Sequence, residues 1–313
     1  MQKQPLLLFT FLIALSLVEH AILIHTHATG LSDSIRATIS PITGHAWWRA
    51  YQNRLLAGIV VKVVGNYEIF LIASLVAINA LTYVLYRNVW TVLLTSSAFI
   101  LLQDPKWIYG WDVLQMILGT ALIIGIVRGY GLRFFVPLFV VSLLNRESGL
   151  YIPLMFVLIF VQKKQYGLSV LWLALGGAGA LWTQFARKTF FHGSCEPSVG
   201  QDLSHAAYGN HFWLLENLRS FFYSYDPSSI HIFDPVPFAI TLVLLFFLLC
   251  WKYWGIIERS MALLCAALWV SILFVGIIHE LRVWLDILPF AVFLSVSFKT
   301  FVTSLPTNIQ RPG

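Results

Sequence analysis

Residues 134–161 read FFVPLFVVSLLNRESGLYIPLMFVLIFV, two apolar runs on either side of the polar segment 145–149. A helix needs roughly 20 apolar residues to cross the hydrocarbon core of a bilayer, and neither run reaches that length. One continuous helix would bury Arg146 and Glu147 near the middle of the membrane, at a cost of about 2.5–3.5 kcal/mol for each charge. A hairpin of two short helices avoids that cost, so we predict a hairpin with its tip at residues 145–149.

The composition of the whole chain agrees with a membrane setting. Of 313 residues, 58% are hydrophobic and 11% are charged, and the mean hydropathy is +0.78. Soluble domains average about 25% charged residues. This composition excludes a soluble globular enzyme, a disordered protein and a nucleic-acid binder, and three cysteines are too few for a disulfide scaffold. We therefore predict an all-α integral membrane protein, with residues 1–313 forming one polytopic domain.

Apolar runs predict about ten transmembrane helices. With Lys3 on the cytoplasmic side, ten crossings place both termini in the cytoplasm. We interpret the first run as a retained span, because Glu19 and His20 interrupt it and no small-x-small cleavage site follows. The ten runs are residues 6–24, 67–86, 89–103, 111–127, 134–144, 150–161, 168–185, 238–251, 261–278 and 287–298.

The charges are distributed unevenly across this topology. The cytoplasmic side has short connections and a single acid, Glu258, whereas all nine histidines and the other thirteen acids fall on the outer side. This excess of basic residues agrees with the positive-inside rule, and we expect a multi-pass protein of a bacterial inner membrane. The cytoplasmic basic residues are Lys3, Arg87, Arg128, Arg133, Lys163, Lys164, Lys252, Arg259, Lys299 and Arg311.

Two extracytoplasmic segments are long enough to contain structure of their own. They are the first outer loop, residues 25–65, and the fourth, residues 186–237. From Arg49 onward the first loop has the pattern of an amphipathic helix lying at the membrane interface. The cytoplasmic connections contain no Gly-rich phosphate loop, which excludes an ATP-driven pump in one chain.

Two polar segments contain residues suited to chemistry. At the hairpin tip, Arg146 offers a forked donor suited to phosphate and Glu147 offers a carboxylate; the alternative is an ion pair that only holds the two short helices. The second segment includes Glu280 and Arg282, followed by Asp286. Residues two apart cannot share a helical face, so we predict a turn or an unwound helix end there. Its alternative is an interfacial loop whose charges reach water.

Acidic and aromatic residues also gather at outer membrane depth. A pair of the carboxylates could bind a divalent cation such as Mg²⁺ or Mn²⁺, or one could be a general base, although each alone is typical of a solvated loop charge. The aromatic residues could stack on sugar rings, but an aromatic belt at the membrane surface explains them better. The carboxylates are Glu19, Asp33, Glu68, Asp104 and Asp112, and the aromatic residues are Trp47, Trp48, Trp107, Tyr109 and Trp111.

Three local patterns resemble the GT-C superfamily of polytopic glycosyltransferases, which use polyprenyl-phosphate-linked sugars as donors. The first is Tyr51-Gln-Asn-Arg54-Leu55-Leu56 after the first outer loop begins. The second is the Asn-Arg-Glu-Ser turn at residues 145–148 between short helices. The third is Glu280-Leu-Arg282 followed by an apolar helix that contains Pro289.

This resemblance implies sugar transfer at the extracytoplasmic face, with membrane lipid and a lipid-linked sugar as partners and no nucleic acid; no protein partner is indicated. It implies that an acidic residue in the first outer loop is the catalytic base, for which Asp33 matches best and Glu19 is the fallback. Arg146 or Arg282 would hold the donor phosphate. A transporter or flippase for a lipid-linked or amphipathic solute, and a non-catalytic subunit of a larger complex, are the alternatives. The full set of expected site residues is Asp33, Glu19 and Glu147 for catalysis, and Arg54, Asp104, Asp112, Arg146, Glu280 and Arg282 for substrate binding.

Overall fold

The computed structural model describes residues 3–27, 30–43, 54–103, 107–190, 214–215, 217–218, 235–275 and 281–304. These residues form α-helices and short 3-10 helices without any strand, which confirms the all-α prediction for this part of the chain. The α-helices are α1 (Lys3–His27), α2 (Leu31–Ile39), α3 (Leu55–Val64), α4 (Tyr67–Tyr86), α5 (Val89–Leu101), α6 (Gly110–Val127), α7 (Leu132–Asn145), α8 (Tyr151–Gln162), α9 (Tyr166–Phe190), α12 (Pro235–Leu249), α13 (Ile256–Val275) and α14 (Leu288–Ser304). The 3-10 helices are η2 (Ser40–Ile42), η4 (Glu147–Leu150), η5 (Trp251–Tyr253) and η6 (Leu281–Asp286).

Five of these helices are long and apolar enough to cross a membrane, judged by length and composition: α1, α4, α6, α9 and α13. Each of the ten predicted spans coincides with a helix, but α5, α7, α8, α12 and α14 are shorter than a full crossing. Leu7 on α1 and Leu181 on α9 are each 73% exposed, as expected for side chains that face lipid. The described helices are thus compatible with a multi-pass integral membrane protein.

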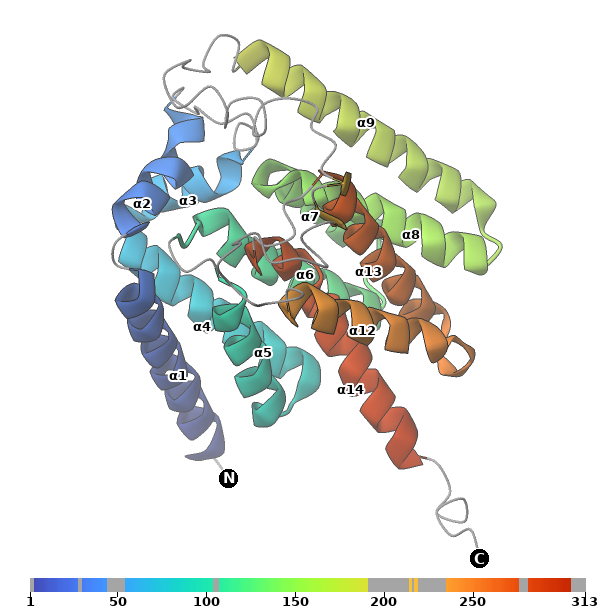
Figure 1. The fold of residues 1–313 in the computed structure, drawn as a ribbon, viewed down its shortest axis with the longest axis horizontal. Coiled ribbons are helices and arrows are strands. Elements are labelled where there is room, and N and C mark those ends of the chain that lie inside the picture. The colour runs from blue at the N-terminus through green and yellow to red at the C-terminus, as the bar shows by residue number, and fades with distance from the viewer. Residues whose placement is uncertain are drawn as a thin grey trace, which may run out of the picture.

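Helix α6 lies at the centre of the bundle (Figure 1). Within its membrane-length window 78% of the residues are buried, compared with 22% in the windows of α1 and α9. One core of buried apolar residues packs α6 against α7, α8, α12, α13 and α14, and a second core packs it against α1, α3, α4 and α5. A polar side chain at the first turn of α6 is therefore covered from both sides.

The predicted hairpin at residues 145–149 is present. Helix α7 ends at Asn145, η4 makes the turn, and α8 runs back along α7, so that the rings of Phe135 and Phe156 lie 4.5 Å apart. Gly149 packs against the last turn of α7, where a Cβ would lie 2.6 Å from the backbone nitrogen of Leu143. The chain reverses closely enough that only glycine fits at this position.

The first outer loop contains more helix than we predicted. Instead of one amphipathic helix from Arg49 onward, the described residues show α2, η2 and α3, and residues 44–53 lie outside the described part. Two hydroxyls of α2 fix it to the segment before α6: Ser34 Oγ accepts from the Ile108 amide at 3.0 Å, and Thr38 Oγ1 accepts from the Gly110 amide at 3.2 Å. In Figure 1, α2 and α3 lie at the end of the bundle opposite the start of α1 and the end of α14. Nearly all of the large loop 186–237 lies outside the described residues.

Candidate functional site

Three arginines converge on the first turn of α6. Arg54 precedes α3, Arg146 joins α7 to η4, and Arg282 lies in η6; their exposed fractions are 8%, 7% and 5%. Between them lies Asp112, which is fully buried in the first turn of α6. Arg146 Nη1 donates to Asp112 Oδ1 at 3.0 Å, and Arg282 Nη1 lies 4.0 Å from Asp112 Oδ2. Together with Asp286 these residues form what we name the arginine–aspartate cluster.

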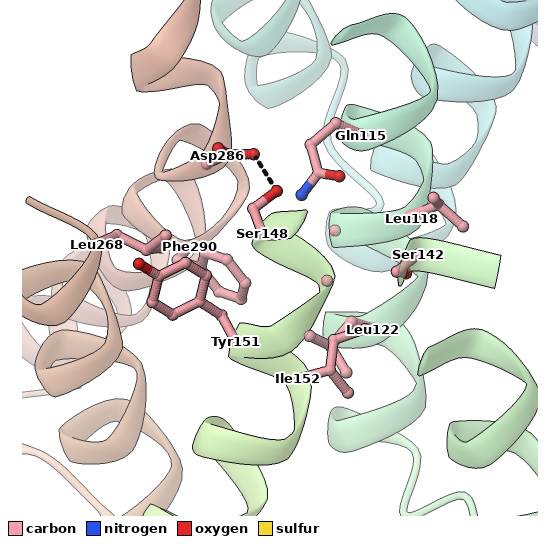
Figure 2. Close-up of a pocket in the computed structure, with 12 residues that line it drawn as sticks. Gln115, Leu118, Leu122, Ser142, Ser148, Tyr151, Ile152, Leu268, Asp286 and Phe290 are labelled. Carbon is pink, nitrogen blue, oxygen red and sulfur yellow. Dashed lines mark hydrogen bonds between the residues drawn. The ribbon is translucent and has the colours of Figure 1, made fainter. Parts of the chain in front are cut away.

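Asp286, the last residue of η6, was not among the expected site residues, although it follows the Glu-x-Arg pattern closely. Its Oδ1 lies 3.7 Å from Arg146 Nη1 and accepts a hydrogen bond from Ser148 Oγ at 3.1 Å. Figure 2 shows Asp286 and Ser148 turned toward each other from η6 and η4. Arg146 is thus held between two aspartates, an arrangement that offsets the cost of burying each charge.

Two buried aromatic rings support the other two arginines. Tyr109 and Trp111 stack with centroids 4.6 Å apart and planes at 12°. The Arg54 guanidinium carbon lies 4.8 Å from the Trp111 ring centroid, and that of Arg282 lies 4.4 Å from the Tyr109 centroid. Both distances are within the range of cation–π attraction. The aromatic-belt interpretation is therefore wrong for Tyr109 and Trp111, which are 5% and 0% exposed.

Local backbone groups add to the electrostatics of the cluster. Asp112 lies at the N-terminus of α6, where the partial positive charge of the helix end favours a carboxylate. The side-chain amide of Asn145 donates to the Trp111 carbonyl at 2.9 Å and so ties the hairpin tip to the same turn. Burial, and next the positive charge of Arg146, lower the pKa of the Arg54 guanidinium.

A narrow cavity of about 20 Å³, roughly the space that one water molecule needs, opens beside Ser148 and Asp286. Figure 2 shows Asp286, Ser148 and Gln115 around its polar end, with Leu122 and Ile152 at the other end. The lining of the cavity is thus polar at one end and apolar at the other. The remaining residues that line it are Leu118, Gly119, Ser142, Gly149, Tyr151, Leu268 and Phe290.

The structure does not bring every expected residue into the cluster. Asp33 is exposed in the first turn of α2, on the helix that covers the start of α6. Glu147 begins η4 at the hairpin tip and is partly exposed. Glu19 lies elsewhere, in contact with α4. Asp104 and Glu280 lie outside the described residues.

Glu19 is the centre of a second polar group, which we name the Glu19 node and which consists of Ser16, Glu19, Asn79 and Ser96. Asn79 Nδ2 donates to Glu19 Oε2 at 2.9 Å and to Ser16 Oγ at 3.0 Å, while Ser96 Oγ donates to Asn79 Oδ1 at 2.6 Å. Sequence reasoning missed Asn79 and Ser96. The available signal was a lone amide inside an otherwise apolar run, since a buried amide requires partners.

The arginine–aspartate cluster does not fit a divalent cation. Asp112 and Asp286 contact Arg146 rather than facing a shared space, and no group of three or more His, Cys, Asp or Glu side chains gathers in the described part of the chain. We therefore assign no chemical step to a metal ion.

No protein-family model, curated protein or solved structure matches this chain. The resemblance to the GT-C superfamily accordingly rests on the three short motifs of the sequence, each of which supplies one arginine of the cluster: Arg54, Arg146 and Arg282.

Proposed function

We propose that the protein is a membrane glycosyltransferase of the GT-C type, which transfers a sugar from a lipid-phosphate-linked donor at the extracytoplasmic face. The supporting observation is that three motifs far apart in the sequence meet at one buried point, with Arg54 and Arg282 on stacked rings and Arg146 between two aspartates. Ten crossings with both termini in the cytoplasm, in a bacterial inner membrane, form part of the proposal.

The arginines have a direct role in this reaction. When a sugar leaves a lipid phosphate, negative charge grows on the phosphate oxygens, and fixed guanidinium groups in a dry site stabilise that charge most strongly. The carboxylates of Asp112 and Asp286 hold Arg146 in place before the donor arrives. Partly exposed Glu147 lies at the start of η4, next to Arg146 in the chain.

Asp286 is better placed than Asp33 to be the general base. It lines the cavity next to Ser148, whereas Asp33 is exposed on α2. An acceptor hydroxyl beside Asp286 would attack the anomeric carbon of the donor sugar and give its proton to Asp286. The bond between that carbon and the phosphate oxygen would break, and the lipid phosphate would depart toward the arginines. Asp33 remains the candidate that the family resemblance favours, and the variants Asp286→Asn and Asp33→Asn distinguish the two.

The test combines lipid analysis of the purified protein with glycan profiling of cells. The full-length protein is purified in lipid nanodiscs, and bound lipids are identified by mass spectrometry. We expect a polyprenyl phosphate to co-purify with the wild type and to be lost in Arg282→Gln. Arg133→Gln, a change at an exposed arginine of α7, serves as the matched control and retains the lipid.

Cell glycans give the second measurement. We expect Arg282→Gln and Asp286→Asn to abolish a glycolipid or glycan that the wild type produces. An unchanged glycan profile in Arg146→Lys, Arg282→Gln, Asp286→Asn and Asp33→Asn, at normal protein levels, contradicts the proposal.

Labelling from either side of the membrane separates the enzyme from its alternatives. In a chain without its native cysteines, Glu147→Cys should react with an impermeant thiol reagent from outside only. Reaction from the cytoplasmic side indicates a transport pathway instead. A stoichiometric partner chain that co-purifies without bound lipid indicates a non-catalytic subunit. Cys250 and Cys265 are buried, so replacing them by alanine leaves the surface unchanged.

A further inference from the structure

The Glu19 node lies between three helices, well away from the arginines. Ser16 and Glu19 come from α1, Asn79 from α4 and Ser96 from α5, and all four residues are at most 4% exposed. Its hydrogen bonds therefore link the first span to the next two. A carboxyl group at such a position in a membrane protein is costly and is typical of a functional site.

The two oxygens of the Glu19 carboxyl group have different surroundings. Oε2 accepts from Asn79, whereas the buried Oε1 has no hydrogen-bond partner among the described residues. The ion pairs between described residues, Arg146–Asp112, Arg146–Asp286 and Arg282–Asp112, do not include Glu19. The charge of an ionised Glu19 would be opposed only by neutral dipoles.

We propose that Glu19 binds a small monovalent cation, either a proton or Na⁺, at this point between α1, α4 and α5. A bound monovalent cation neutralises a single carboxylate and occupies the side of Oε1 that no protein group satisfies. The hydroxyl and amide oxygens of Ser16, Asn79 and Ser96 are neutral, so the node offers one negative charge. A divalent ion would need further carboxylates, which this node lacks.

Other titratable groups do not take part in the node. Helix α5 contains none, and those of α1 and α4 form no hydrogen bond or ion pair with Glu19 in the described structure. We therefore expect cation binding at Glu19 to depend on pH or on the Na⁺ concentration, without coupling to the titration of a second side chain. The titratable residues of these two helices, besides Glu19, are Lys3, His20, His25, His27, Tyr67, Glu68, Tyr83 and Tyr86.

Infrared spectroscopy and thermal unfolding test the proposal on the purified full-length protein. If the cation is a proton, the wild type at neutral pH shows the carbonyl-stretch band of a protonated carboxyl group, and Glu19→Gln removes that band. If it is Na⁺, replacing choline by Na⁺ at constant ionic strength raises the Tm of the wild type, and Glu19→Gln abolishes the rise. The control is Glu68→Gln, at an exposed acid in the first turn of α4, which should leave both signals unchanged.

Either positive result supports the site and identifies its cation. The proposal is overturned if the wild type shows neither a protonated-carboxyl band that depends on Glu19 nor a rise in Tm with Na⁺. Ser96→Ala provides a check that keeps the carboxyl group: it should shift the position of the band or weaken the Na⁺ effect, because it alters the hydrogen bonding of Asn79. Both measurements are independent of any glycosyltransferase activity.

Discussion

Asp112 and Glu19 are both buried carboxyl groups, with exposed fractions of 0% and 3%, but their surroundings differ. Asp112 has the Arg146 guanidinium at 3.0 Å and Arg282 at 4.0 Å. Glu19 has an amide and hydroxyl groups instead. The comparison separates two ways of keeping a carboxyl group out of water. In ion pairing, the protein supplies both the carboxylate and the cationic side chain. In neutralisation by a bound cation, the protein supplies only the carboxylate. Variants that remove the negative charge should therefore cost more stability at Asp112 than at Glu19.

Removing Arg146 should have the largest effect. Arg146→Ala leaves Asp112 buried without its closest cation, which typically costs about 3–5 kcal/mol. The free energy of unfolding, measured by denaturant titration in detergent, should fall by that amount. Arg133→Ala, at an exposed arginine of α7, should change it by no more than about 0.5 kcal/mol.

The double variant Arg146→Met with Asp112→Leu separates the cost of a lone charge from the value of the pair. It should recover most of the lost stability, because an apolar pair leaves no charge uncompensated. Equal stability of Arg146→Ala and the wild type would show that Asp112 is not held by ion pairing.

Isosteric neutralisation compares the two carboxyl groups directly. Asp112→Asn removes the charge that Arg146 and Arg282 face, and we expect a loss of about 2–3 kcal/mol, in the range of hydrogen bonds to charged groups. Glu19→Gln keeps an oxygen for Asn79 and removes no ion pair, so we expect a loss below about 1 kcal/mol. Thermal unfolding of both variants in the same detergent measures the difference. A larger loss for Glu19→Gln than for Asp112→Asn would reverse the comparison.

The fold could be predicted where the cost of burial is local. The hairpin follows from two charged residues between apolar runs. The cost of burying these charges in one continuous helix, compared with a hairpin of two short helices, can be judged from that segment alone. The ten apolar runs all became helices for the same reason. The short helix α2 was missed because nine residues within an outer loop give little periodic pattern. Its position depends on hydrogen bonds that Ser34 and Thr38 accept from the backbone of a distant segment.

The candidate site could be predicted only in part. Arg146 and Arg282 were named from two polar segments and Arg54 from the family resemblance, but their meeting with Asp112 depends on packing between helices that no local pattern records. Asp286 was passed over because its role arises from Ser148, which is 138 residues away in the chain. The same limit explains why Glu19 was noticed and its partner Asn79 was not.

Small effects are also expected at Ser96 and Ser148, which donate hydrogen bonds to Asn79 of the Glu19 node and to Asp286 of the arginine–aspartate cluster. Ser96→Ala leaves Asn79 Oδ1 without its 2.6 Å donor in a fully buried place, so we expect a loss of about 1–2 kcal/mol. Ser148→Ala removes a 3.1 Å bond at a partly exposed residue where Asp286 keeps Arg146 nearby, so we expect about 0.5–1 kcal/mol. Ser295→Ala is the control, since that exposed hydroxyl bonds only the carbonyl of Ala291 one turn earlier in α14, and it should change the midpoint of unfolding very little. If Ser148→Ala costs more stability than Ser96→Ala, then Ser148 supports the cluster in the resting state. If the loss is smaller, as we expect, the role of Ser148 lies in the cavity, and Ser148→Ala should reduce activity more than stability.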